Sequence, residues 1–260
     1  MGSQWQNFLR NLGEWRGSFA SMDANGTVQD CTASILTLEA LEGDQMVRFR
    51  LRRFADGDSS GTPSRDVSED YRSLGRQVVF FDNGTFCKGT LQVAPGSSFG
   101  GEFGFVDGDR RHRLVQLHTA DGDLNALVLI REFRAGTTAS EQPPLLAEQL
   151  IGSWRGDAAT ITADWPEPES ASAMLTVAAD GSGALQLCAS VGQQLEPCEG
   201  RLLLLPDAGY HLSPIQVSHR SPFSVQAGWL PEPGRLECLI RRFDGTGAWR
   251  SSTQLRLRRS

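Results

Sequence analysis

Histidine and carboxylate side chains are the residues of this chain that could carry out acid–base or nucleophilic chemistry. The histidines are His112, His118, His211 and His219. None stands beside a Gly-x-Ser-x-Gly elbow, a phosphate-binding loop or a second ligand at metal-binding spacing. The carboxylates Asp66, Glu69 and Asp70 fall in the polar stretch 56–72, which we expect to be a solvated loop or barrel insertion. We therefore predict no catalytic, cofactor-binding or metal-ligating residues, and we expect the histidines to lie on the surface.

The five cysteines are also expected to be chemically inert. Their number is odd, and no two of them lie at the spacing of a zinc finger, a zinc ribbon or a disulfide framework. A buried free cysteine packs as a small hydrophobic residue. The sequence therefore predicts neither a metal centre nor a redox pair.

A Gly-x-Trp-Arg-Gly motif occurs twice and is the most specific pattern in the chain. Residues 12–17 read Leu-Gly-Glu-Trp-Arg-Gly, and residues 151–156 read Ile-Gly-Ser-Trp-Arg-Gly. A second match joins residues 129–133, Leu-Ile-Arg-Glu-Phe, to residues 239–243, Leu-Ile-Arg-Arg-Phe. Each half of the chain opens and closes alike, which indicates a duplicated unit.

We interpret Trp15 and Trp154 in these motifs as plugs, one at an end of each unit. An indole is large enough to seal a small barrel, and glycine lets a neighbouring strand or ring approach closely. Arg131 and Arg241, on the matching closing strands, are predicted to lie over the indoles as cation–π partners, a contact worth ~0.5–2 kcal/mol. A structural role is favoured over a ligand-binding role because only structural surroundings are repeated with the motif.

Hydrophobic residues outside the motifs alternate with polar ones, which is the period of a half-buried β-strand. In residues 46–52, for example, Val47, Phe49 and Leu51 share one face and three arginines share the other. Asn-Gly and Asp-Gly pairs between such runs are typical of tight hairpin turns. Closing a long antiparallel meander removes its exposed edges. We therefore predict an all-β fold of two tandem antiparallel β-barrels.

The polar, proline-ended stretch 134–144 separates the two units. We place the first barrel at residues 1–136, a linker at 137–145 and a second, smaller barrel at 146–260. Short helix-prone segments precede both Gly-x-Trp motifs, so a helical turn is expected to introduce each barrel.

Arg48, Arg50 and Arg52 form a basic stripe on the polar face of the strand predicted at 46–52. Arginine is enriched at protein interfaces, so this arginine stripe is a candidate surface for a protein partner. The alternative is an ordinary solvated barrel face, since strand faces turned to water are usually charged. The sequence leaves both readings open and favours the solvated face.

Composition and charge limit the classes of partner. The formal net charge of −6 argues against a general nucleic-acid-binding protein, which usually has a basic surplus. No window of about 18 apolar residues is present, so no membrane span is expected. The N-terminus lacks the charged and apolar tandem of a secretion signal. A cytoplasmic or stromal-type compartment is predicted.

The ends of each half resemble the calycins, the superfamily of lipocalins and fatty-acid-binding proteins. Its members open with Gly-x-Trp and finish with an arginine packed over the tryptophan, so the resemblance implies calycin-like (lipocalin-like) barrels. An eight-stranded barrel can hold one small ligand. A carrier of a small apolar ligand, or a bilin-handling protein similar to the phycobiliprotein chromophore lyases, is therefore one functional hypothesis.

A resemblance to one family covers nearly the whole chain. Residues 5–15, 113–117 and 130–137 are similar to a tandem calycin-like family of cyanobacteria and chloroplasts, first described as a domain of unknown function. Its plant members resemble the chloroplast biogenesis factor required for ATP synthase, which assists assembly of the catalytic F1 part. The resemblance implies a non-enzymatic assembly role in which the protein binds F1 subunits, and this hypothesis is preferred.

Overall fold

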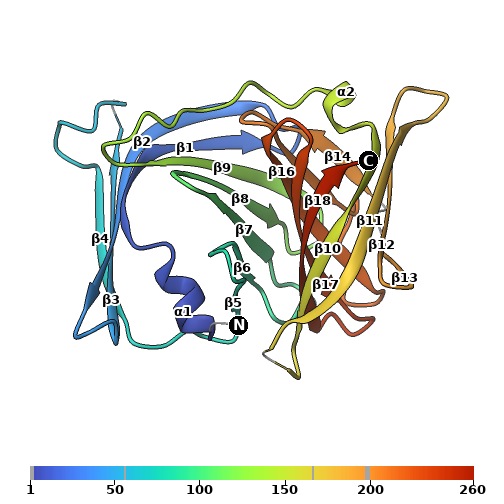
Figure 1. Cartoon of the computed structure of the whole chain (residues 1–260), viewed down its shortest axis with the longest axis horizontal. Coiled ribbons are helices and arrows are strands. Elements are labelled where there is room, and N and C mark those ends of the chain that lie inside the picture. The colour runs from blue at the N-terminus through green and yellow to red at the C-terminus, as the bar shows by residue number, and fades with distance from the viewer. Residues whose placement is uncertain (1–2, 56, 166, 197–199) are drawn as a thin grey trace.

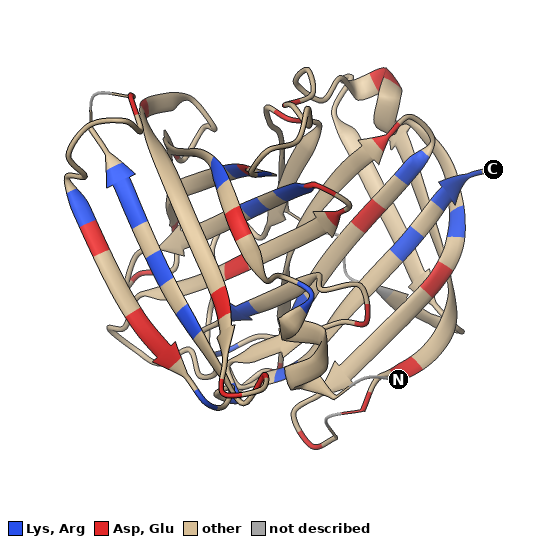
Figure 2. Ribbon diagram, turned by 60° about the vertical axis from the view of Figure 1, so that its left-hand side comes forward, with Lys and Arg blue, Asp and Glu red and all other residues tan. Residues whose placement is uncertain are grey.

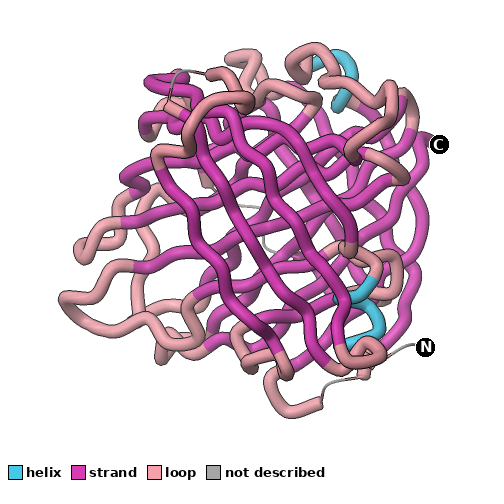
Figure 3. The backbone as a smooth tube through the Cα atoms, turned by 90° about the vertical axis from the view of Figure 1, so that its left-hand side faces the viewer, coloured by secondary structure: helices cyan, strands magenta, loops and turns pink. Residues whose placement is uncertain are grey.

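Antiparallel strands make up most of the computed structural model, which describes residues 3–55, 57–165, 167–196 and 200–260 (Figure 1 and Figure 3). They form two curled sheets, one from each half of the chain. Only two short helices accompany the sheets in these ranges, and neither is long and apolar enough to cross a membrane. The prediction of an all-β fold with two tandem antiparallel units is confirmed.

The first sheet contains nine strands in the order β4-β3-β2-β1-β9-β8-β7-β6-β5. The first strand pairs with the last, and the end strands, β4 and β5, follow one another in the chain. The sheet is therefore a half-barrel with its two edges at β4 and β5. The bounds are α1 Gln4–Leu9, β1 Gly13–Asp23, β2 Val28–Leu41, β3 Met46–Phe54, β4 Arg65–Tyr71, β5 Val78–Phe80, β6 Phe86–Gly89, β7 Phe99–Asp107, β8 Arg110–His118 and β9 Leu124–Arg134.

The second sheet repeats this topology in the order β13-β12-β11-β10-β18-β17-β16-β15-β14. Its first strand again pairs with its last. The bounds are α2 Ala147–Leu150, β10 Gly152–Thr162, β11 Glu169–Ala179, β12 Leu185–Val191, β13 Gln194–Glu196, β14 Arg201–Leu204, β15 Gly209–Ser213, β16 Phe223–Glu232, β17 Arg235–Phe243 and β18 Trp249–Arg259. The order of the strands thus supports a duplicated unit independently of the motifs.

A short helix introduces each sheet, as predicted. α1 begins after Ser3, whose hydroxyl accepts a hydrogen bond from the backbone N–H of Gln6. It lies within the curl of the first sheet (Figure 1), where Phe8 packs on Phe80 with ring centroids 5.2 Å apart. α2 is a single turn with Leu150 fully buried. The first helix therefore covers part of the space that the first sheet encloses.

β4 forms within the stretch 56–72, where the sequence predicted a loop, so that prediction is wrong for this strand. Arg48 of β3 pairs with Asp70 at 2.9 Å, and Arg50 pairs with Asp66 at 2.7 Å. Figure 2 shows the basic segments of β3 beside the acidic segments of β4. Opposite charges on neighbouring strands stabilise the pairing without apolar burial. Hydrophobic alternation could therefore not reveal this edge strand.

The two sheets pack against each other through a shared apolar core that the sequence did not predict. Phe103, Phe105 and Leu114 of the first sheet belong to the same buried cluster as Trp229 and Leu239 of the second. β8 and β16 are consequently buried along most of their length on both faces. The two units form one packed body rather than two barrels joined only by a linker.

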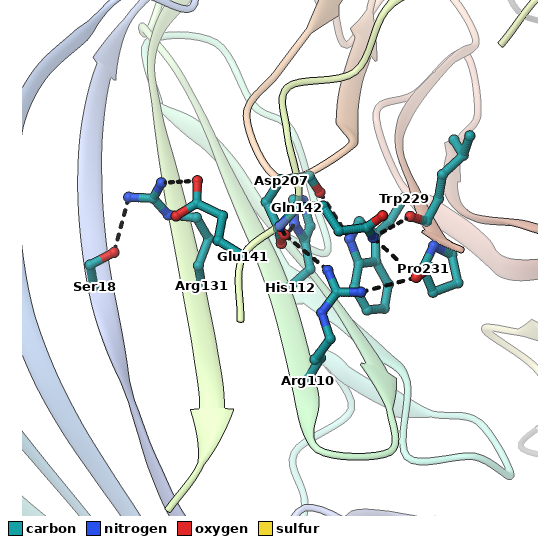
Figure 4. Close-up of polar contacts among 10 residues, drawn as sticks. Ser18, Arg110, His112, Arg131, Glu141, Gln142, Asp207, Trp229 and Pro231 are labelled. Atoms are coloured by element: carbon teal, nitrogen blue, oxygen red, sulfur yellow. Dashed lines mark hydrogen bonds and ion pairs between the residues drawn. The ribbon is translucent and has the colours of Figure 1, made fainter. Parts of the chain in front are cut away.

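Asp207 is the polar centre of this interface (Figure 4). Its carboxylate accepts hydrogen bonds from Arg110 at 2.9 Å and from the backbone N–H of Gln142 at 2.8 Å, and it lies 2.9 Å from His112 Nδ1. His112 stacks on Trp229 with ring centroids 5.6 Å apart. Burial alone would raise the pKa of Asp207, but the contacts with His112, Gln142 and Arg110 lower it. Gln142 therefore fixes the segment between the sheets to the second half of the chain, and Asp207 in turn contacts Arg110 and His112 of the first sheet.

His112, His118 and His211 are buried in the interface, so the prediction that the histidines lie on the surface is wrong for these three. Burial lowers the pKa of His118 to about 4. Burial, assisted by the charges of His118 and Arg201, lowers the pKa of His211 to about 3. Both imidazoles are therefore neutral in the folded protein at neutral pH.

Acidification below about pH 6.5 is expected to destabilise the fold through these histidines, because the unfolded imidazoles bind protons while the folded ones stay neutral. The free energy of unfolding should fall by up to about 1.4 kcal/mol per pH unit for each histidine. The pKa of Glu102 is lowered from 4.5 to about 2, so its own contribution is lost only below about pH 4.5. Urea denaturation of the wild type and of His118→Leu between about pH 6.5 and 4.5 gives the contribution of His118 as the difference between the two slopes, and the slope should be smaller in the variant. An unchanged slope in that variant would contradict this assignment.

Candidate functional site: the lumen of the first sheet

Trp15 and Trp154 occupy the same position in the two sheets. Both are fully buried, and each indole N–H donates a 2.8 Å hydrogen bond to the carbonyl four residues earlier, of Asn11 and of Leu150 respectively. A buried indole usually finds such a partner for its N–H. The two motifs therefore build the same local structure at the start of each sheet.

Arg134, not Arg131, lies over Trp15. The guanidinium carbon of Arg134 is 4.3 Å from the centroid of the Trp15 ring, and the two residues are partners in the β1–β9 register. Arg131 is an odd number of positions away on the same strand, so it faces the opposite side. There it forms an ion pair with Glu141 at 2.5 Å and donates to the Ser18 hydroxyl (Figure 4). The prediction for Arg131 is wrong because it missed the strand's alternation of faces.

Arg259, not Arg241, lies over Trp154, with 4.6 Å between the guanidinium carbon and the ring centroid. Residues 239–243 belong to β17, which pairs with β16 and β18, whereas residues 129–133 belong to β9, which pairs with β1. The strand that corresponds to β9 is β18. The two similar segments are therefore not equivalent, and the buried Arg241 donates instead to a carbonyl of the first half of the chain.

The glycines of the motif meet two steric requirements. Gly13 and Gly152 have φ values of +119° and +134°, a region that L side chains rarely adopt. A Cβ on Gly17 or Gly156 would lie 1.8 Å or 2.0 Å from a carbonyl oxygen of the closing strand. The close packing of β1 on β9, and of β10 on β18, thus accounts for both glycines.

Five charged side chains meet on the floor of the lumen of the first sheet; we call them the charged floor. Glu132 accepts hydrogen bonds from Arg111 at 2.7 Å and from Arg113 at 2.9 Å. Glu102 accepts from Arg113 at 2.7 Å and pairs with Lys88 at 2.9 Å. They come from β6, β7, β8 and β9, whose alternate residues face the lumen. The charged floor is thus a chain of ion pairs across four neighbouring strands.

The charges of this floor hold the two glutamates ionised. Burial alone would raise the pKa of Glu102, but Lys88 and Arg113 lower it to about 2. Burial would likewise raise the pKa of Glu132, and Arg111 and Arg113 outweigh it. For Arg111 burial dominates and lowers the pKa, with Glu132 offsetting only part of the effect. Arg111 is therefore the least compensated charge of the floor.

Hydrogen-bonding capacity on the charged floor is uneven. Each carboxylate oxygen of Glu102 and Glu132 already accepts from Lys88, Arg111 or Arg113. Nη2 of Arg111 is buried and has no hydrogen-bond partner within the described part of the chain. The floor therefore contains an unused donor, whereas its carboxylate acceptors are already engaged.

Apolar side chains form the walls above the charged floor. The cavity has a volume of about 340 Å³, and its apolar lining includes Phe8, Leu36, Leu38, Phe49 and Phe86. Small-molecule sites have comparable dimensions, with mostly apolar walls and a few placed polar groups. The lumen is suited to holding a small molecule, whereas the residues lining it do not form a nucleophile and base pair.

The charged floor has no counterpart at the equivalent register positions among the described residues of the second sheet. The strand registers place Leu236, Cys238 and Leu257 at the positions that correspond to the two arginines and the buried glutamate of the first sheet. These residues belong to the apolar cluster that surrounds Trp154 in the second lumen. Because the same topology forms around an apolar filling, the fold itself does not require the charged floor.

The arginine stripe lies on the other side of the first sheet from the lumen. Arg48 and Arg50 are exposed and paired with β4, and Arg52 has no ion pair among the residues that the structure describes. Phe49 and Leu51 of the same strand pack toward the interior. The stripe and the lumen are therefore two separate candidate sites that share β3.

The fold and this lumen define a tandem calycin-like β-protein. Residues 1–137 match the model of the N-terminal domain of DUF3598, a domain of unknown function. Residues 141–198 and 190–260 match the model of the C-terminal domain of biogenesis factor required for ATP synthase 1. The chain belongs to the DUF3598 family.

A solved structure of the same family supports this assignment. A crystal structure of a DUF3598-family protein of unknown function from Nostoc punctiforme is 39% identical over 100% of both chains, with a TM-score of 0.90. An S-type phycobiliprotein lyase from Guillardia theta is 16% identical, covers 53% of this chain and 95% of its own, and has a TM-score of 0.34. That likeness is too low to support an inference about function. A search of the curated proteins finds no match.

Proposed function

We propose that this protein is a non-enzymatic assembly factor of ATP synthase that binds subunits of the F1 part. The main support is the match of residues 141–198 and 190–260 to the C-terminal domain of a biogenesis factor required for ATP synthase. The packed body of two sheets suits this role, because a rigid surface binds a partner with little loss of conformational entropy. The shared apolar core and the Asp207 contacts supply that rigidity.

The arginine stripe is the surface that we propose for contact with the F1 subunit. Arg48 and Arg50 each make two hydrogen bonds to one carboxylate, of Asp70 and Asp66, which hold both guanidinium groups extended over β4. Exposed ion pairs of this kind contribute little to folding stability. Arginine is also among the residues enriched where proteins meet. Substitutions on this face should consequently change binding more than folding.

Binding to purified F1 α, β and γ subunits, each immobilised separately, tests the proposal. We expect at least one subunit to retain the protein. The variant Arg48→Gln/Arg50→Gln/Arg52→Gln should bind it roughly tenfold more weakly. Its melting temperature should fall only slightly, because exposed ion pairs contribute about 0–1 kcal/mol each. Arg16→Gln is the matched control, since Arg16 is also exposed and ion-paired, with Glu14 at 2.7 Å.

Two results would argue against the assembly role. One is that no F1 subunit retains the protein. The other is retention by immobilised phycobiliprotein subunits, tested in parallel, but not by F1 subunits, which would favour a bilin-handling protein. Equal weakening by the Arg16→Gln control would remove the arginine stripe as the contact surface.

A further inference from the structure

We propose that the lumen of the first sheet binds one small amphipathic monoanion, such as a carboxylate with an apolar chain. Its charged head would contact Arg111, and its chain would lie against the apolar walls. This site is separate from the protein surface proposed for F1 subunits and does not depend on it.

The sign of the ligand's charge follows from the hydrogen bonds of the charged floor. Its three basic and two acidic side chains leave one net positive charge. The carboxylate oxygens are all engaged by Lys88, Arg111 and Arg113, so a cationic head would find no open acceptor there. Nη2 of Arg111 is the unused group, and it is a donor. An anion supplies the acceptor that this buried group lacks.

Arg111 is held in place before any ligand arrives. Its Nε donates to Glu132 at 2.7 Å, its Nη1 donates to Asn11 Oδ1 at 3.3 Å, and its guanidinium carbon lies 4.7 Å from the Trp15 ring centroid. The side chain is only 2% exposed. A donor fixed on three sides loses little entropy when it binds, which favours affinity. The plug tryptophan thereby also supports the proposed binding group.

Comparison of the two sheets indicates that the charged floor is not needed for folding. The second sheet places leucine and cysteine where the first has its arginines, and it reaches the same topology. Buried ion clusters are weak contributors to stability compared with apolar packing. A role in binding explains why a cluster with an unpaired donor stands in the first lumen, beside a cavity of about 340 Å³.

Titration calorimetry of the full-length protein with decanoate tests the site, with decanol as the uncharged probe and decyltrimethylammonium as the cationic one. We expect decanoate to bind with one molecule per chain. Decanol should bind roughly 10- to 100-fold more weakly, the factor expected for one charge-assisted hydrogen bond. Decyltrimethylammonium should bind more weakly than decanol.

Two variants locate the site. Arg111→Leu introduces the residue type of the second sheet and should reduce decanoate affinity to that of decanol, with decanol affinity unchanged. Leu38→Trp should fill the lumen and remove binding of both probes. Arg256→Leu, at an exposed arginine outside the lumen, is the control and should bind decanoate as the wild type does.

The results that support the proposal differ from those that overturn it. If Arg111→Leu does not fold, Arg111→Lys keeps the charge, and a reduced preference for decanoate over decanol in that variant would support the proposal. Equal affinity for decanoate and decanol in the wild type would overturn it. So would the absence of decanoate binding, or decanoate binding that survives both Leu38→Trp and substitution of Arg111.

Discussion

Glu132→Leu alone is expected to lower the free energy of unfolding by about 3–5 kcal/mol. The carboxylate is fully buried and accepts hydrogen bonds from both Arg111 and Arg113. Removing it leaves two buried guanidinium groups without their shared counter-charge, which is the costly way to break a buried ion cluster. Urea denaturation of the wild type and the variant near neutral pH measures the loss.

The combined variant Arg111→Leu/Arg113→Cys/Glu132→Leu/Glu102→Gln is the control for this prediction. It gives the first lumen the residue types that the second sheet has at the corresponding register positions. The variant removes the four buried members of the charged floor and keeps Lys88, whose side chain is 46% exposed. Replacing buried ion pairs with apolar residues is often neutral or stabilising. We expect a much smaller loss than in the single variant, or none. A single variant as stable as the wild type would contradict a coupled charged floor.

Trp15→Ala is expected to cost about 3–5 kcal/mol of unfolding free energy, and Trp154→Ala to cost a similar but smaller amount. Both indoles are fully buried and fill the start of their sheet. Trp15 additionally lies against two guanidinium groups, of Arg134 and Arg111, whereas Trp154 lies against one, that of Arg259. The loss in the first sheet should therefore be the larger of the two.

Denaturation of Trp165→Ala provides the matched control for the tryptophan variants. This indole is 58% exposed, and surface substitutions of this kind usually change stability little. The three variants differ in burial while sharing the same chemical change. If Trp15→Ala and Trp165→Ala unfold at the same urea concentration, the interpretation of Trp15 as a plug is wrong.

The duplicated unit could be recognised from sequence because its motif is tied to local geometry. Gly13 needs a positive φ and Gly17 needs close strand contact, so the same residue types return at Gly152 and Gly156. Alternating hydrophobicity identified the strands for the same reason, since it reflects the two faces of a sheet. Both signals place particular residue types at fixed positions within a short segment, so they can be read from the sequence even though Gly17 contacts the distant strand β9.

Contacts that depend on strand register could not be predicted in the same way. Arg131 and Arg134 lie on one strand, and only the pairing with β1 decides which of them faces Trp15. The match between residues 129–133 and 239–243 is local similarity between strands in different places of the two sheets. Register is a property of the pair of strands, and one strand's sequence does not contain it.

The sequence did not reveal the charged floor, because both faces of β8 are buried. Arg111 and Arg113 face the lumen, while His112 and Leu114 face the second sheet. A strand with polar residues on both faces looks solvated when it is read alone. The two halves of the sequence do differ here, since Leu236 and Cys238 stand where the first half has Arg111 and Arg113. This difference can be recognised only when the strand registers show that the positions are equivalent.

A crystal structure of the full-length protein grown with decanoate tests most directly whether the two copies have diverged into one binding lumen and one filled core. The account predicts one decanoate in the first lumen, with a carboxylate oxygen within hydrogen-bonding distance of Arg111 Nη2 and no ligand in the second. Decanoate in the second lumen, or bound only outside both sheets, would contradict it.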